Sequence, residues 1–186
     1  MSSLIINNLP NIENYSYLEL GIRDNRNFNA IKSKNKFSVD MNGLAMFTGT
    51  TDEYFAQLDA DIKFDIIFID ACHDYEFVVK DFNNAVDHCN KWILLHDMKP
   101  PTGYYTKRSL CSDSYRVLYY LLTNTNFEIY PMHNNFGFTL VKMPVSKITP
   151  PAEYASTPYQ EFKSFINNVK FYSDDEIIEI LRKENV

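Results

Sequence analysis

The chain has 186 residues, 45% of them hydrophobic, which is enough for one sizeable core and fits a single domain with a tail. Its net charge of −6 argues against an electrostatic grip on nucleic acid or an anionic membrane, so a small molecule or a glycan is the expected partner. Three cysteines without a CxxC pair indicate reduced thiols, and no apolar run approaches the roughly 18 residues that span a bilayer. We therefore expect a cytoplasmic protein without a membrane segment.

Short apolar runs alternate with helical stretches along the chain, which predicts an α/β fold. Seven runs have strand-like composition, namely residues 17–20, 37–39, 44–47, 64–69, 92–95, 127–130 and 136–141. The runs 64–69 and 92–95 are nearly continuous in apolar residues, as in central parallel strands that are covered on both faces.

A helix is expected between those two central strands, because apolar residues recur there at spacings of three and four. These residues are Val78, Phe82, Ala85, Val86 and Cys89. Thr50-x-x-Glu53 and Ser173-x-x-Glu176 have the spacing of capping boxes, which predicts helices that begin near Thr51 and Asp174.

The pattern changes after Pro144, where prolines break regular structure and two short amphipathic helices follow. We therefore divide the chain into a sheet domain, residues 1–143, and a helical C-terminal extension, residues 144–186. The extension is expected to pack on the sheet domain. A substrate lid and a contact within a homo-oligomer are the alternatives.

Ligands of open α/β sheets bind beyond the carboxyl ends of the strands, so the residues that follow each strand form the candidate site. Gly21 follows the first strand and can let a ligand approach the backbone, and Asn25 tolerates a left-handed conformation. Asp40 ends the second strand, 19 positions after Gly21, about where an acid reaches ribose hydroxyls in dinucleotide-binding folds. Taken alone, this pair is more simply explained by a plain turn.

The two central strands end in Asp70-x-x-His73 and in His96-Asp97. If the strands are neighbours, about 4.8 Å apart, then Asp70, His96 and Asp97 face one crevice and could share a divalent cation. Such a cation would lower the pKa of a substrate hydroxyl, and His73 could take its proton. A role for Asp70 as a helix cap and for His96 as an ordinary strand-end histidine stays open.

With these motifs the chain resembles class I S-adenosylmethionine-dependent methyltransferases, in the branch that includes cephalosporin hydroxylase-like proteins and macrolide-sugar O-methyltransferases. The similarity runs from Tyr17 to about Val141. Residues 18–28 resemble the nucleotide loop, Val39-Asp40 the ribose-binding acid and residues 49–55 the segment beside the adenine. Residues 64–75 are the most specific match.

The resemblance implies a Rossmann-like three-layer sandwich with a seven-stranded, mostly parallel sheet whose last strand is antiparallel. It implies S-adenosylmethionine as cofactor, bound by Glu19, Gly21, Asn25, Asp40, Thr51, Asp52 and Asp70. It also implies a divalent cation such as Mg²⁺ on Asp70, His96 and Asp97, and His73 as general base beside Asp70. The reaction expected from it is O-methylation of a small-molecule or sugar hydroxyl, with metal assistance left open.

Three departures from the family pattern stand out. Asn25 replaces the second glycine of the loop, His96 replaces an acid of the metal site, and only Met41-Asn42-Gly43 separates the expected second and third strands. A non-catalytic module of the same fold is therefore the main alternative function. A nicotinamide-dependent oxidoreductase ranks last, because the chain lacks the three-glycine fingerprint. Tyr104 and Tyr105 are candidates for the wall of an acceptor pocket.

Overall fold

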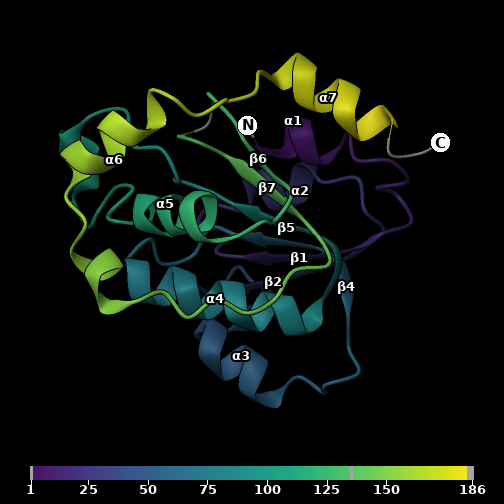
Figure 1. Cartoon of the computed structure of the whole chain (residues 1–186). Coiled ribbons are helices and arrows are strands. Elements are labelled where there is room, and N and C mark those ends of the chain that lie inside the picture. The colour runs from purple at the N-terminus through teal and green to yellow at the C-terminus, as the bar shows by residue number, and fades with distance from the viewer. Residues whose placement is uncertain (1, 135, 184–186) are drawn as a thin grey trace.

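The computed structural model describes residues 2–134 and 136–183, and these fold into a sheet between two layers of helices (Figure 1). The strands are β1 (Ser16–Leu20), β2 (Asn35–Asp40), β3 (Phe47–Thr48), β4 (Phe64–Ile69), β5 (Cys89–Leu95), β6 (Ile129–Pro131) and β7 (Thr139–Lys142). They lie in the order β3-β2-β1-β4-β5-β7-β6, and of these strands β7 alone runs in the direction opposite to the others. The predicted three-layer α/β fold with an antiparallel last strand is confirmed.

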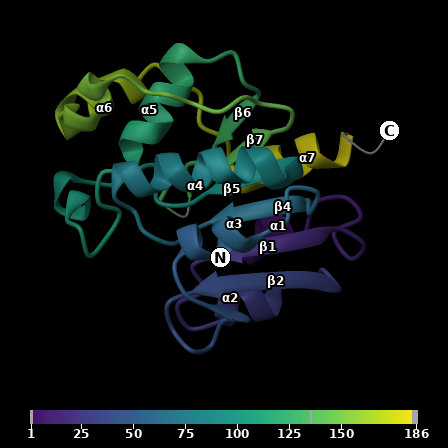
Figure 2. The same ribbon diagram turned by 90° about the horizontal axis from the view of Figure 1, so that it is seen from below.

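Within the described residues, seven α-helices surround the sheet. They are α1 (Ser2–Ile6), α2 (Arg26–Ala30), α3 (Thr51–Gln57), α4 (Tyr75–His88), α5 (Tyr115–Asn124), α6 (Tyr159–Ile166) and α7 (Asp174–Lys183). Figure 2, seen from below, shows α4 running along the direction of the strands, and among the strands it contacts β4 and β5. No helix within the described ranges is long and apolar enough to cross a membrane.

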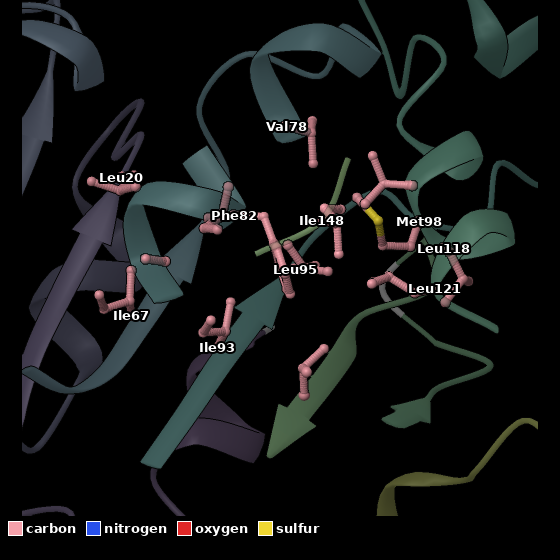
Figure 3. Packing of buried hydrophobic residues seen from close by; sticks show 14 of the residues in the cluster. Leu20, Ile67, Val78, Phe82, Ile93, Leu95, Met98, Leu118, Leu121 and Ile148 are labelled. Carbon is pink, nitrogen blue, oxygen red and sulfur yellow. The ribbon is translucent and has the colours of Figure 1, made fainter. Parts of the chain in front are cut away.

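Alternate side chains of the central strands point into two separate cores, which explains their nearly continuous apolar sequence. Ile67 and Leu95 face one core, where they meet Val78 and Phe82 of α4 and Leu118 of α5 (Figure 3). The opposite core holds the alternate strand residues together with side chains of α1, α2 and α7; its strand members include Ile66, Phe68, Trp92 and Leu94.

Both predicted capping boxes are present. The Thr50 hydroxyl accepts a hydrogen bond from Glu53 N at 3.2 Å, and the Glu53 carboxylate accepts one from Thr50 N at 2.8 Å. Ser173 and Glu176 make the same pair of contacts before α7. The predicted starts of α3 and α7 are therefore correct.

The third strand, predicted over residues 44–47, begins only at Phe47, because residues 44–46 form a turn. The Asn42 side chain accepts a hydrogen bond from Leu44 N at 2.9 Å, and Asn42 N donates one to Oδ1 of Asp40 at 2.9 Å. These local bonds compete with strand pairing, and the side chains of Leu44 and Met46 stay exposed. The connection from β2 to β3 is consequently residues 41–46, twice as long as predicted.

The last two strands begin later than the sequence predicts. Phe136 and Gly137 have φ angles of 54° and 84°, which are incompatible with extended structure, so β7 begins at Thr139. Before β6, Phe127 N is bound by the side chain of Thr125 in a turn, and the strand begins at Ile129.

The C-terminal segment packs on both faces of the sheet. Phe162 of α6 lies in the core with α5, where its ring is 5.0 Å from that of Tyr115, while Ile177 and Leu181 of α7 lie in the opposite core. Between the two helices, Tyr172 forms a parallel bridge with Met132 beside β6. The division at residues 143 and 144 stays a prediction, and residues 1 and 184–186 of it lie outside the described part.

Candidate active site

A cavity of about 1070 Å³ opens at the carboxyl ends of β1, β2, β4 and β5. The predicted site residues that line it are Gly21, Asp40, Thr51, Asp52, Asp70, His73, His96 and Asp97. Strand order reverses at this point, because β2 lies on one side of β1 and β4 on the other. This is where open α/β sheets bind their ligands.

The fold itself requires a glycine at position 21, independently of any ligand. Its φ of 86° is unfavourable for residues with a Cβ atom. A Cβ atom at Gly21 would also lie 2.2 Å from the carbonyl oxygen of Asp70. The end of β1 therefore touches the end of β4 here, a reason for glycine that its sequence neighbourhood did not reveal.

The Asp40 carboxylate organises the loop that follows β1. Its Oδ2 accepts hydrogen bonds from Ile22 N at 2.8 Å and Arg23 N at 3.0 Å, and its Oδ1 accepts one from Asn42 N. One side chain thus fixes both loops at this end of the cavity, and it lines the cavity itself.

Two of the predicted cofactor residues do not line the cavity. The Glu19 side chain lies on the face of the sheet opposite to α4. There its Oε2 accepts hydrogen bonds from the Tyr17 hydroxyl at 2.6 Å and from Nδ2 of Asn27 at 3.2 Å. Burial raises the pKa of Glu19 to about 7, although both hydrogen bonds oppose the shift. Asn25 does adopt the expected left-handed conformation, with a φ of 67°, but its side chain is turned to the Leu44 carbonyl.

Asp70, His96 and Asp97 converge at the ends of β4 and β5. Ile69 pairs with Leu95 in parallel register, so the residues that follow them are neighbours. Nδ1 of His96 lies 3.2 Å from Oδ1 of Asp70 and 3.3 Å from Oδ1 of Asp97. One donor atom from each of the three residues falls within 4.8 Å of the others, as the sequence predicted.

His96 and Asp97 can share a site because of the backbone between them. Successive residues of a strand point to opposite faces, but Asp97 has a φ of 59°, which turns its side chain back beside that of His96. Aspartate tolerates this left-handed conformation better than most residues. Ser114 stabilises the turn by donating a hydrogen bond to the Asp97 carbonyl at 2.6 Å.

His73 completes the cluster from the loop that precedes α4. Its Nδ1 lies 2.6 Å from the carbonyl oxygen of Leu110 and 3.1 Å from Oδ2 of Asp97, while its Nε2 lies 3.3 Å from Oδ1 of Asp70. Because a carbonyl only accepts hydrogen bonds, Nδ1 carries the proton, and the lone pair of the neutral ring is on Nε2.

The charges of the cluster shift the pKa values of Asp70, His73 and His96. Burial opposes ionisation, but Asp70 and Asp97 outweigh it, raising the pKa of His96 to about 10 and that of His73 above its usual value. Burial likewise disfavours the Asp70 carboxylate, yet the two histidines hold its pKa below the ordinary value. Strong perturbation of neighbouring groups in a cleft is typical of functional sites.

The geometry agrees with what comparison to known proteins shows. Residues 20–98 match a protein family described as a methyltransferase domain. The matched segment runs from the end of β1 past Asp97, so it contains Gly21, Asp40 and the whole acid and histidine cluster. This segment of the chain is a methyltransferase domain. The predicted family and enzyme class are confirmed.

Solved structures support the fold of this methyltransferase domain. A protein from Klebsiella pneumoniae assigned as an O-methyltransferase has 11% sequence identity and a TM-score of 0.56, over 77% of this chain and 79% of that one. An O-methyltransferase from Bacillus cereus, in complex with SAH, has 14% identity and a TM-score of 0.50, over 77% of this chain and 89% of that one. No curated protein matches the chain in sequence.

The methyltransferase cavity has further walls that the sequence did not single out. Tyr105 lines it as predicted and packs on Phe136 with ring centres 5.4 Å apart, whereas Tyr104 is exposed and does not line it. Phe77, on the first turn of α4, and Arg108 also line it.

Proposed function

We propose that this methyltransferase transfers a methyl group from S-adenosylmethionine to a hydroxyl of a small molecule or sugar. The observation that carries the proposal is the continuity of the cavity. The same space is lined by the loop residues Gly21 and Asp40 at one end and by His73 beside Asp70 at the other.

The residues present fit the cofactor. The Asp40 carboxylate is held by backbone N–H groups and retains lone pairs that can accept hydrogen bonds from ribose hydroxyls. Thr51 and Asp52 line the neighbouring wall at the start of α3, where the adenine is expected. Glu19 supports the cofactor loop only indirectly, through its hydrogen bond with Asn27. Asn25 shapes the same loop through its backbone conformation.

His73 is the proposed general base. The acceptor oxygen forms a bond to the methyl carbon while the bond from that carbon to sulfur breaks, and the hydroxyl proton passes to Nε2 of His73. Asp70 lies next to that nitrogen and stabilises the imidazolium that forms. The Leu110 carbonyl fixes the ring by accepting the hydrogen bond of Nδ1.

The cluster also fits a divalent cation. Nδ1 of His96 is buried and has no hydrogen-bond partner within the described ranges, although two carboxylate oxygens face it. Asp70, His96 and Asp97 would hold the cation. When bound, it would polarise the acceptor hydroxyl and lower its pKa.

Calorimetric titration with S-adenosylhomocysteine, with and without excess Mg²⁺, tests the proposal. Binding in the micromolar range is expected, because the cavity presents both the loop and the acid that the cofactor requires. Absence of binding under both conditions would contradict the cofactor assignment and favour a non-catalytic module. The cytoplasmic location and a homo-oligomeric state belong to the same proposal and are open to fractionation and light scattering.

A further inference from the structure

We propose that the cluster of Asp70, His96 and Asp97 selects a transition-metal ion of the Zn²⁺ or Co²⁺ type over Mg²⁺. This inference rests on the proposed function, because the cation is relevant to catalysis only if the protein transfers methyl groups. It starts from a residue by which this chain departs from its family, since His96 stands where an acid is expected.

The separations between donor atoms suit a small cation. Metal–ligand bonds of about 2.0–2.1 Å place neighbouring ligand atoms about 2.8–3.4 Å apart in tetrahedral or octahedral geometry. Nδ1 of His96 lies 3.2 Å and 3.3 Å from the two facing carboxylate oxygens.

The chemistry of the donors decides between cations of similar size. Mg²⁺ prefers oxygen ligands and loses water reluctantly, whereas imidazole nitrogen suits Zn²⁺, Co²⁺ and Ni²⁺. An acid at position 96 would give an all-oxygen site, and His96 converts it to one nitrogen and two carboxylates. Histidine nitrogen and carboxylate oxygen are both Zn²⁺ ligands, and three protein ligands leave a position open for substrate.

The surroundings hold the donors in place. The His96 ring packs edge-to-face against Phe68 and Phe138, whose ring centres are 6.1 Å and 6.4 Å away. The Cys111 thiol donates a hydrogen bond to Oδ1 of Asp97 at 3.3 Å, the same oxygen that faces His96. Such outer contacts orient ligands and tune affinity.

Co²⁺ absorption provides a direct test on the full chain without cofactor or acceptor. The protein, stripped of metal with a chelator, is titrated with Co²⁺, and the visible bands of the bound ion are followed. Zn²⁺ should displace Co²⁺ near stoichiometric amounts, while Mg²⁺ should fail to do so even at roughly thousandfold excess.

The decisive variant is His96→Asn, which places an oxygen near the position of Nδ1 with little change of shape. Affinity for Zn²⁺ should fall at least about tenfold, and the ratio of Zn²⁺ to Mg²⁺ affinity should fall with it. His133→Asn is the matched control, because His133 is exposed and outside the cavity; it should bind like the wild type. If His96→Asn does not fold by circular dichroism, His96→Gln serves in the same comparison.

The outcomes separate this inference from the proposed function. Equal affinity for Mg²⁺ and Zn²⁺, or an unchanged ratio in His96→Asn, overturns the selectivity. Failure of any cation to bind overturns the site, and S-adenosylhomocysteine binding in the same preparation then leaves methyl transfer standing. If the protein binds Co²⁺ but does not bind S-adenosylhomocysteine, the proposed function is contradicted and the metal site is not.

Discussion

The carbonyl oxygen of Asp70 lies where a side chain on Gly21 would begin, 2.2 Å from an ideal Cβ position. Gly21→Ala should therefore destabilise the protein strongly, since it adds a backbone clash to the cost of a positive φ, about 1–2 kcal/mol by itself. Gly43→Ala is the matched control, because no atom lies within 4 Å of its Cβ position. Urea unfolding of both variants measures the difference. Equal stability would show that the two strand ends are not in contact.

Asp40→Ala should weaken S-adenosylhomocysteine binding by roughly tenfold to a hundredfold, because it removes the acceptor of three backbone N–H groups as well as a ribose ligand. Calorimetry gives the affinity. Asp24→Ala removes a carboxylate from the same loop that pairs with Arg26 outside the cavity, so it should bind almost normally. Equal losses in both variants would point to general loosening of the loop instead.

His73→Ala should lower turnover by roughly 10²–10⁴-fold while leaving S-adenosylhomocysteine affinity nearly unchanged, since His73 is proposed to act on the acceptor proton. The assay is release of S-adenosylhomocysteine with hydroxylated small molecules and sugars as acceptors. His133→Ala should retain full turnover. A His73→Ala enzyme that works at the wild-type rate on a defined acceptor would remove His73 from the mechanism.

Asp81 gives the stability of the protein a pH dependence. Burial on α4 raises its pKa from 3.8 to about 7, against an opposing hydrogen bond from Thr51. The folded state then keeps a proton that the unfolded state has lost, so the free energy of unfolding falls as pH rises from about 4 to about 7 and then levels off.

Asp81→Asn should remove this dependence, because asparagine does not ionise. The free energy of unfolding of the variant, relative to that of the wild type, should therefore increase between pH 4 and pH 8 by on the order of 1–4 kcal/mol. Unfolding of both proteins in urea across this range gives the comparison. Asp87→Asn, which changes an exposed residue at the end of the same helix, should leave the slope as in the wild type. Parallel curves for the wild type and Asp81→Asn would show that Asp81 is ionised in the folded protein.

The sheet could be predicted where side-chain pattern alone decides the structure. Residues 64–69 are a strand from end to end, because both faces are buried and almost every position must be apolar. Residues 44–47 are also largely apolar, but hydrogen bonds from the Asn42 side chain and its neighbours fold the chain into a turn. A bond between side chain and backbone is invisible to hydropathy, which explains the failure.

The candidate site could be predicted in part for the same reason. Asp70, His96 and Asp97 follow buried strands directly, so their meeting required only that the strands be adjacent. Glu19 could not be placed correctly, because its face of the sheet depends on the pleat within β1. Phe136 and Cys111 come from long connections, whose course over the cavity depends on tertiary packing.

The two ends of the sheet determine how this protein can associate with itself. β3 is only two residues long, and the free side of β6 is partly covered by Tyr172, whose N–H donates to the Pro131 carbonyl at 2.8 Å and whose carbonyl accepts from His133 N at 3.0 Å. In the described part of the chain β3 pairs only with Val39 and Asp40, so residues 35–38 of β2 are left as a short unpaired edge, while Tyr172 covers part of β6. Short edges of this kind limit β-aggregation, and they favour a dimer formed through side chains of helices and loops over one that continues the sheet from one molecule into the next.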